Sequence, residues 1–306
     1  MRPEGVDLTY LSLPIEETFF RMLRHREFDA AEMSLSSYVV ALCQGAPFVA
    51  IPVFPSRAFR HNGIYVNAAA GIDHPGDLVG RTVGVPEYQL TANVWIRGVL
   101  AEHHGVPVES VRYRVGGLHQ PGRVEKMPLD LPPGVEVEPI PDGWTLAEML
   151  VAGDIDALYS PRIPRPFLEG RETVRRLFPD PRPAEEAYFT QTGIFPIMHT
   201  VVLRRDVYDR DPWVAQSLYK AFEEAKRHTE DRMEETAAFR YMLPWLYDEV
   251  ERVHGLMGRD FWPYGLPAND TTLRTFLGYA HAQGLTPRQL EPAELFAPET
   301  LESYRI

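Results

Sequence analysis

The sequence predicts an α/β protein of two lobes followed by a helical C-terminal region. Short apolar runs, which are typical of buried strands, alternate with amphipathic helical stretches as far as residue 203. Beyond this point the pattern is almost entirely helical, and helices are expected over 212–233, 236–257 and 270–283. The 306 residues suffice for about two domains, yet no Ser/Gly-rich or low-complexity linker divides them. This favours two lobes joined by crossing strands over two separate domains.

The first third of the chain contains a mixture of expected strands and helices. Apolar and polar residues alternate over 6–13, as in a strand, and an amphipathic helix is expected over 16–26. A second helix, over 34–42, begins with hydroxyl side chains suited to an N-cap. The apolar run 48–54 and the shorter run 64–67 complete this part as buried strands.

The middle of the chain repeats strand and helix and contains one long irregular stretch. Residues 116–141 hold many Pro and Gly residues, which interrupt helices, so a loop with a short edge strand near 135–138 is expected. Residues 163–182 carry several prolines and are expected to be mostly irregular. The regular elements expected around them are a loop and strand over 77–85, strands over 155–159 and 200–203, and helices over 91–102 and 145–151.

The charge balance limits the class of partner. The chain has 43 acidic and 31 basic residues and a formal net charge of -12. Nucleic acids and anionic membranes are polyanions, so neither is expected to be a partner. A small anionic substrate remains compatible, because a cleft can collect positive charge while the outer surface stays acidic.

Cysteine content and hydropathy indicate in which cellular compartment the protein is expected. Cys43 is the single cysteine, so no intrachain disulfide can form, and its apolar surroundings in the sequence predict a buried structural thiol. Residues 1–7 are polar and lack the apolar core of a secretory signal. No stretch approaches the ~18 consecutive apolar residues of a membrane span. These features predict a cytoplasmic protein.

Five segments carry a resemblance to a known family: residues 32–38, 54–61, 84–91, 193–200 and 260–265. Together they resemble the 4,5-dihydroxyphthalate decarboxylase family, and the similarity runs through essentially the whole chain. The resemblance implies a type II periplasmic-binding-protein-like fold, with a cleft between two α/β lobes. It also implies a carboxy-lyase that converts 4,5-dihydroxyphthalate to protocatechuate and CO2.

The resemblance implies a discontinuous first lobe. The chain is expected to leave lobe one after the strand 64–67 and to return through 199–203. Lobe one would then comprise 1–78 with 200–306, and lobe two 79–199. Members of the family begin with a further strand ahead of the segment that matches 2–6, so lobe one is expected to lack its first strand.

The chemistry of such a substrate sets what the site must contain. Each carboxylate has a hydroxyl para to it, and loss of the phenolic proton pushes electron density toward the carbon that bears the carboxylate. Protonation of that carbon gives a dienone, and loss of CO2 restores the aromatic ring. The protein must hold two carboxylates, deprotonate a phenol and deliver a proton to carbon. Because the ring itself is the electron sink, no cofactor is expected.

Arginines are the expected ligands of the two carboxylates, since the guanidinium fork matches a carboxylate in bidentate fashion. Arg57 and Arg60 follow a buried strand, which is where ligands bind in open α/β folds. The alternative is that both are surface arginines near a hinge. Arg162 is a third expected substrate-binding residue.

Two helix starts supply further candidates. Ser36 and Ser37 open a helix whose free N–H groups favour an anion, although a plain N-cap is the commoner role of such serines. Glu87, Tyr88 and Thr91 join a strand to a helix in the opposite lobe. Tyr88 is a candidate to stack on or hydrogen-bond the ring, and Thr91 to donate to a carboxylate. Glu87 is a candidate base, with a solvated turn residue as the alternative.

His61 and His199 are the candidate acid–base groups, because imidazole titrates near the working pH and both lie at expected lobe crossings. The alternative is that each is a satisfied core histidine. No His-x-His, His-Glu-x-x-His or Cys-x-x-Cys spacing occurs, so no metal is expected. Convergence of His61, Glu87 and His199 in space is the arrangement that would overturn this.

Two other functions remain open at this point. One is a non-catalytic binding protein for a small aromatic carboxylate, since the implied fold is that of a receptor. The other is an enzyme of the same fold that acts on a different carboxylate. The expected partner in each case is a small acid, with an aromatic di-acid favoured, and assembly into a homo-oligomer is left open.

Overall fold

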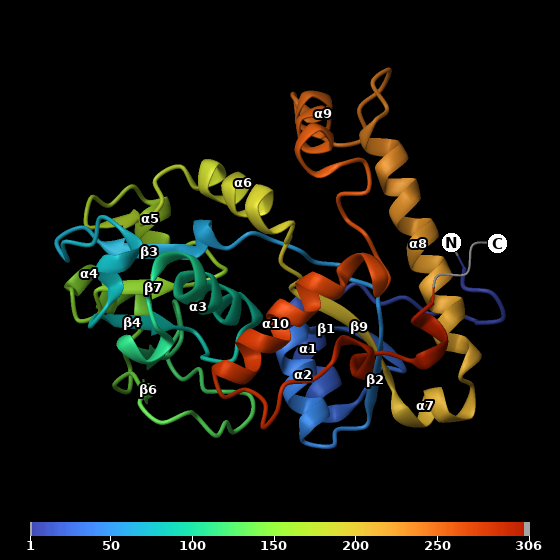
Figure 1. The fold of residues 1–306 in the computed structure, drawn as a ribbon, viewed down its shortest axis with the longest axis horizontal. Helices are drawn as coiled ribbons and strands as arrows, with labels where there is room; N and C mark the ends of the chain where they lie inside the picture. The colour runs from blue at the N-terminus through green and yellow to red at the C-terminus, as the bar shows by residue number, and fades with distance from the viewer. Residues whose placement is uncertain (1, 303–306) are drawn as a thin grey trace.

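A computed structural model, which describes residues 2–302, contains two β-sheets in separate halves of the molecule (Figure 1). The first has three strands in the order β1-β9-β2, with β1 at Ala30–Ser34, β2 at Phe48–Ile51 and β9 at His199–Arg204. β9 lies in the middle and is antiparallel to both neighbours. Strands far apart in the sequence therefore form the core of lobe one.

The second sheet has six strands in the order β6-β5-β4-β7-β3-β8. Their bounds are β3 Ile64–Asn67, β4 Thr82–Val85, β5 Arg112–Val115, β6 Glu136–Pro139, β7 Ala157–Tyr159 and β8 Val174–Arg176. β4 is parallel to β5 and β7, whereas β3 is antiparallel to β7 and β8. The carboxyl ends of β4, β5 and β7 thus share one edge, where ligands bind in such sheets.

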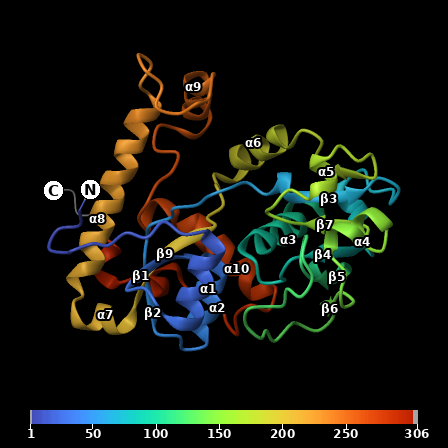
Figure 2. The same ribbon diagram turned by 180° about the vertical axis from the view of Figure 1, so that it is seen from behind.

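Helices cover both sheets and form most of the chain after β9. The first half of α8 packs on the first sheet through Ala215 and Leu218, and Figures 1 and 2 show its far end and α9 projecting from lobe one. The helices are α1 Ile15–His25, α2 Leu35–Cys43, α3 Thr91–His104, α4 Leu146–Ala152, α5 Arg165–Leu168, α6 Pro181–Thr192, α7 Arg205–Arg210, α8 Trp213–Met233, α9 Leu246–Met257 and α10 Asp270–Ala282.

The two-lobed α/β class and the helical C-terminal region are confirmed, but several elements differ from expectation. The strand expected over 6–13 is wrong: this segment pairs with no strand, and its Tyr10 is 77% exposed. β1, β5 and α6 were not anticipated, and 163–182 is less irregular than expected, because it contains α5 and β8. α9 begins at Leu246 and not at 236, because Pro244 opposes an earlier start.

The sheet pairing also moves one crossing between the lobes. β3 pairs with β7 and β8, so residues 64–67 lie in the second sheet and not in the first. The chain therefore leaves lobe one between β2 and β3, earlier than the expected boundary near 78. The segment that makes this crossing contains Arg57 and His61, which bears on their role.

α10 anchors the two lobes to each other through α3. Arg97 of α3 donates from Nε to Gln283 Oε1 at 2.8 Å, and Trp95 donates from Nε1 to the carbonyl of Ile197 at 2.9 Å. Gly98 allows a close approach, because a Cβ at this position would lie 2.1 Å from the Tyr279 ring. The packing fixes α3 with its N-terminal end toward lobe one.

Candidate functional site

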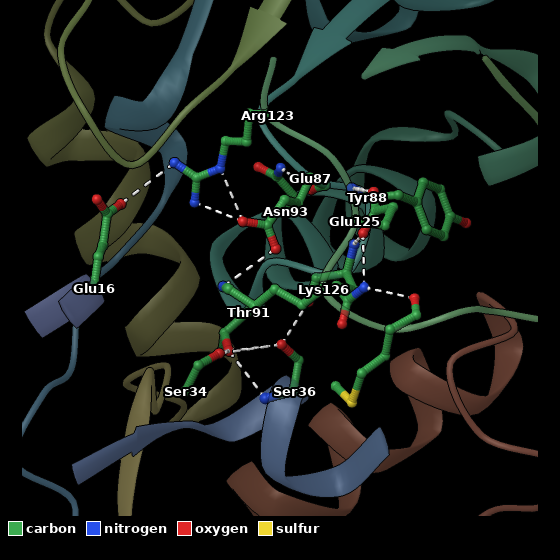
Figure 3. Close-up of polar contacts among 12 residues, drawn as sticks. Glu16, Ser34, Ser36, Glu87, Tyr88, Thr91, Asn93, Arg123, Glu125 and Lys126 are labelled. Carbon is green, nitrogen blue, oxygen red and sulfur yellow. Dashed lines mark hydrogen bonds and ion pairs between the residues drawn. The ribbon is translucent and has the colours of Figure 1, made fainter. Parts of the chain in front are cut away.

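The two lobes meet where α2 and α3 begin, in a contact that we call the seam (Figure 3). Thr91 Oγ1 accepts from the backbone N–H of Ser36 at 3.0 Å and lies 2.8 Å from Ser34 Oγ. The hydroxyl of Ser36 donates to the carbonyl of Gln89. Ser37, the next residue, is buried in the first turn of α2 and takes no part in these contacts. Sequence reasoning placed Ser36 and Thr91 in opposite lobes, and the structure brings them together.

Glu87, directly beyond β4, lies beside the seam in contact with two cations (Figure 3). Arg123 donates to its Oε1 from Nε at 2.8 Å and from Nη2 at 2.6 Å. Lys126 Nζ lies 3.2 Å from Oε2, in ion-pair contact without the alignment of a hydrogen bond. The Glu87 side chain is 2% exposed, whereas that of Arg123 is 29% exposed. Glu87 thus has the contacts of a counter-ion, and the cations have one face toward solvent.

Arg162 reaches the same place from the end of β7. Its Nη2 lies 3.2 Å from Glu16 Oε2, and Glu16 Oε1 lies 3.5 Å from Arg123 Nη1. Glu16 belongs to the first turn of α1 in lobe one. Arg123, Lys126 and Arg162, which we call the cationic cluster, therefore gather where lobe two faces α1.

Glu125 ties the loop that bears these cations to the turn after β4. It accepts hydrogen bonds from the backbone N–H groups of Tyr88 and Gln89 and from Gln89 Nε2, the last at 2.8 Å. Burial raises the pKa of Glu125 above its ordinary value, although these hydrogen bonds act in the opposite direction. Because Glu125 stands between Arg123 and Lys126 in the chain, its anchoring places both cations.

His199 begins β9 and forms a pair with Glu32 of β1. Nδ1 of His199 lies 2.6 Å from Glu32 Oε1. The strand register sets Ser34 opposite His199, and the alternation of side chains puts Glu32 and Ser34 on one face of the sheet. Phe19 of α1 packs its ring edge-on against the imidazole, with the ring centroids 4.9 Å apart. His199 therefore lies next to the seam, beside the hydroxyls of Ser34 and Thr91.

His61 lies elsewhere, at the far end of α3 from Thr91. Its ring packs against Tyr188 and Phe178 with centroids 5.6 and 5.4 Å apart, and against His104 in the last turn of α3. Since α3 is 14 residues long, this is roughly 20 Å from the seam. Burial, with smaller contributions from His104 and His103, lowers the pKa of His61 from 6.5 to about 4. The structure does not bring His61 and His199 together.

The packing of His61 predicts an acid-dependent loss of stability. A histidine that is neutral when folded, with pKa about 4, and that protonates near 6.5 when unfolded stabilises the fold above pH 6.5. Between these values the unfolded state binds the extra proton, so unfolding free energy falls as pH falls, by up to about 1.4 kcal/mol per unit. Urea melts at several pH values measure this dependence, and the unfolding free energy of His61→Gln is expected to change less with pH than that of the wild type. The same pH dependence in both proteins would contradict the lowered pKa of His61.

Two of the three arginines expected to bind carboxylates, Arg57 and Arg60, lie outside the cationic cluster and contact other parts of the protein. Arg57 donates to the carbonyls of Phe195 and Pro263 at 3.0 and 2.7 Å and to the side chain of Asn269. Arg60 donates from Nε to Met198 Sδ at 3.1 Å and borders a cavity of about 10 Å³, which is the size of roughly one water molecule. Burial lowers the pKa of each guanidinium to about 10. The three contacts of Arg57 are those of a residue that fixes the crossing between lobes.

Tyr88 also points away from the seam. Its hydroxyl donates to the carbonyl of Gln283 at 3.1 Å, and Arg97 lies 3.7 Å from the ring centroid. Burial raises the pKa of this phenol. The side chain thus anchors α10 to lobe two, and only the backbone N–H of Tyr88 faces the site residues.

Between residues 2 and 302, no three His, Cys, Asp or Glu side chains are grouped so that they could hold a metal ion, and His61, Glu87 and His199 do not converge. No helix in that range has the length and apolar character needed to cross a membrane.

No family model matches the chain. The 4,5-dihydroxyphthalate decarboxylase of Comamonas testosteroni is 44% identical over 304 residues, which cover 99% of this chain and 92% of that protein. The enzyme of the same name from Pseudomonas putida is 46% identical over 187 residues, 61% of this chain and 72% of that protein.

Solved structures with a related arrangement are more distant. The periplasmic aliphatic sulphonate binding protein SsuA of Escherichia coli aligns over 92% of this chain and 84% of its own, at 14% identity and a TM-score of 0.49. The desulfurization enzyme DszB aligns over 90% of this chain and 85% of its own, at 14% identity and a TM-score of 0.44.

Proposed function

The chain belongs to the 4,5-dihydroxyphthalate decarboxylase family, and we propose that it converts 4,5-dihydroxyphthalate to protocatechuate and CO2. The observation that carries the proposal is the 44% identity to a relative of that name, over 99% of the chain. The site at the seam supports the same chemistry, because it combines a cationic cluster with a histidine–carboxylate pair.

The cationic cluster suits the two carboxylates of the substrate. Arg123, Lys126 and Arg162 supply three positive charges, and the carboxylates of Glu87 and Glu16 offset part of them. An aromatic dianion that enters between α1 and the end of the second sheet gains charge-assisted hydrogen bonds from this cluster. We propose that Arg123 and Lys126 hold the carboxylates while Glu87 holds both cations in place.

His199 is the proposed proton donor. The net reaction replaces a ring carboxylate by hydrogen and so consumes one proton, which must reach carbon. The imidazole of His199 lies beside the seam, and imidazole is the side chain that most often serves as a general acid. Ser36 and Thr91 hydrogen-bond to each other across the seam, so we propose that they set the separation of the lobes around the ring.

Product analysis tests the proposal directly. Incubation with 4,5-dihydroxyphthalate is expected to release CO2 and protocatechuate in equal amounts, and prior dialysis against EDTA is expected to leave the rate unchanged. Tight binding of the di-acid without CO2 release would favour a binding protein. Turnover of a different aromatic carboxylate alone would favour another enzyme of this fold. The cytoplasmic location and any homo-oligomer stay predictions from the sequence.

A further inference from the structure

Glu32 has no assigned role, yet it makes one of the short polar contacts at the seam. We infer that Glu32 is a positioning residue that acts through His199: its carboxylate holds Nδ1–H, so that Nε2 is the atom that gives a proton to the substrate. The inference rests on the proposed function, because it deepens the role of His199 in that reaction. Its support is the contact of 2.6 Å between His199 Nδ1 and Glu32 Oε1.

Both partners stand on regular strands, which makes the pair rigid. Glu32 lies in β1 and His199 in β9, and five residue pairs between these strands fix the register. Phe19 packs against the ring with an interplanar angle of 86°, which restrains ring rotation. A site built on strands holds its geometry better than one built on loops. The imidazole is therefore held in one orientation by the backbone, a carboxylate and an aromatic edge.

The charges around Glu32 argue that its carboxylate serves the histidine. Within residues 2–302, His199 is the one basic side chain that forms an ion pair with Glu32, and no Lys or Arg competes. The side chains of His199 and Glu32 are 20% and 29% exposed, so the pair is reachable from the seam and not sealed in the core. An ion pair that stays partly exposed contributes little to stability. Fixing the tautomer of an imidazole is the established use of such a carboxylate.

The proton transfer to carbon starts from the ionised phenol, whose proton is lost to solvent beforehand and is regained from solvent after CO2 has left. Protonated His199 carries Nδ1–H, held by Glu32, and Nε2–H. The proton on Nε2 passes to the ring carbon that bears the carboxylate, and the imidazole becomes neutral. The bond from that carbon to the carboxylate then breaks, its electron pair returns to the ring, and CO2 leaves. Solvent restores the proton on Nε2 before the next turnover.

Replacing Glu32 by Gln tests the role through the kinetics. Glu32→Gln is expected to lower kcat about 10- to 100-fold with KM nearly unchanged, because the partner of a working histidine affects the chemical step and not substrate affinity. Glu32→Asp, which keeps the charge, is expected to recover part of the rate. The matched control is Asp206→Asn, which removes a carboxylate paired with Arg204 at the other end of β9 and is expected to leave kcat unchanged.

Two further measurements separate this inference from a structural role and from failure of the proposed function. Adding Glu32→Gln to His199→Asn is expected to lower kcat no further, since the effects of residues that act as a unit are not additive. Full additivity would overturn the inference.

Proton NMR of the wild type is expected to show a downfield, exchange-protected Nδ1–H signal that His199→Asn removes and Glu32→Gln shifts. This signal does not depend on turnover. A wild type that shows the signal but releases no CO2 would refute the proposed function and leave the pair standing, whereas an active wild type with an unaffected Glu32→Gln variant would refute the positioning role.

Discussion

Replacement of His199 by Asn is expected to lower kcat for 4,5-dihydroxyphthalate by about 10²–10⁴-fold, the usual contribution of general acid–base catalysis. Asn retains a side-chain hydrogen-bond donor toward Glu32 but has no titrating group, so it cannot deliver a proton to carbon. Binding of the di-acid, measured by calorimetry, is expected to change much less, because His199 is not proposed to hold a carboxylate. The measurement is the initial rate of CO2 release under saturating substrate.

Two other histidine variants show whether the effect is specific to the seam. His228→Asn removes a histidine of α8, far from the seam, and is expected to leave kcat unchanged. His61→Asn is expected to cost much less activity than His199→Asn, since its ring packs against Tyr188 and Phe178 at the other end of α3. A larger loss of kcat in the His61 variant, with its fold intact, would reverse the assignment of the proton donor.

The sequence predicts the helix starts of the site because their signal is local. Ser36 and Thr91 each follow a strand and open a helix, and hydroxyl residues in such positions can be recognised without knowledge of the fold. Their contact across the seam was not predicted, because it depends on how the two lobes pack against each other. The sequence therefore indicates both hydroxyls at helix starts but not the hydrogen bond between them.

Arg162 was an expected member of the cationic cluster, but Arg123 and Lys126 could not be predicted in the same way. Arg123 and Lys126 lie in the stretch 116–141, in the part that precedes its expected edge strand and for which a loop is predicted. Their place depends on Glu125, which accepts hydrogen bonds from the N–H groups of the turn after β4. That contact joins residues 36 or more positions apart. No local pattern reports it, so arginines that follow a strand, such as Arg57, were the more visible candidates.

The histidines show how one strand can decide a site. His61 and His199 both flank short strands at expected crossings, and the sequence treats them alike. β3, however, pairs with β7 and β8 and draws His61 toward the far end of α3, whereas β9 pairs with β1 and keeps His199 beside Glu32. In a strand, Glu32 and Ser34 point to the same face, which would have indicated Glu32 as the partner of His199. β1 itself, however, was not anticipated.

Replacement of Arg123 by Gln is expected to lower kcat/KM by about 10- to 100-fold, mainly through KM. A charge-assisted hydrogen bond to a carboxylate contributes ~1.5–3 kcal/mol, and the guanidinium fork is the best match for that group. Substrate titrations of the wild type and the variant measure the change. Arg114→Gln on β5 is the matched control, because it removes an arginine paired with Glu136 and Glu138 away from the seam and is expected to have no effect on kcat/KM.

The difficulty with this variant is that it also leaves Glu87 with a single cation, and an uncompensated buried carboxylate is destabilising. Adding Glu87→Gln to Arg123→Gln removes that charge and separates the two roles of the arginine. If Arg123 binds a substrate carboxylate, the double variant is expected to regain stability in thermal melts while kcat/KM stays low. If Arg123 serves only to neutralise Glu87, the double variant recovers wild-type kcat/KM, and the proposed place of the substrate at the cationic cluster is wrong. Glu87→Gln alone completes the comparison: an abolished kcat with unchanged KM would identify Glu87 as the base that deprotonates the phenol, whereas a change confined to KM is expected of a residue that holds the cations.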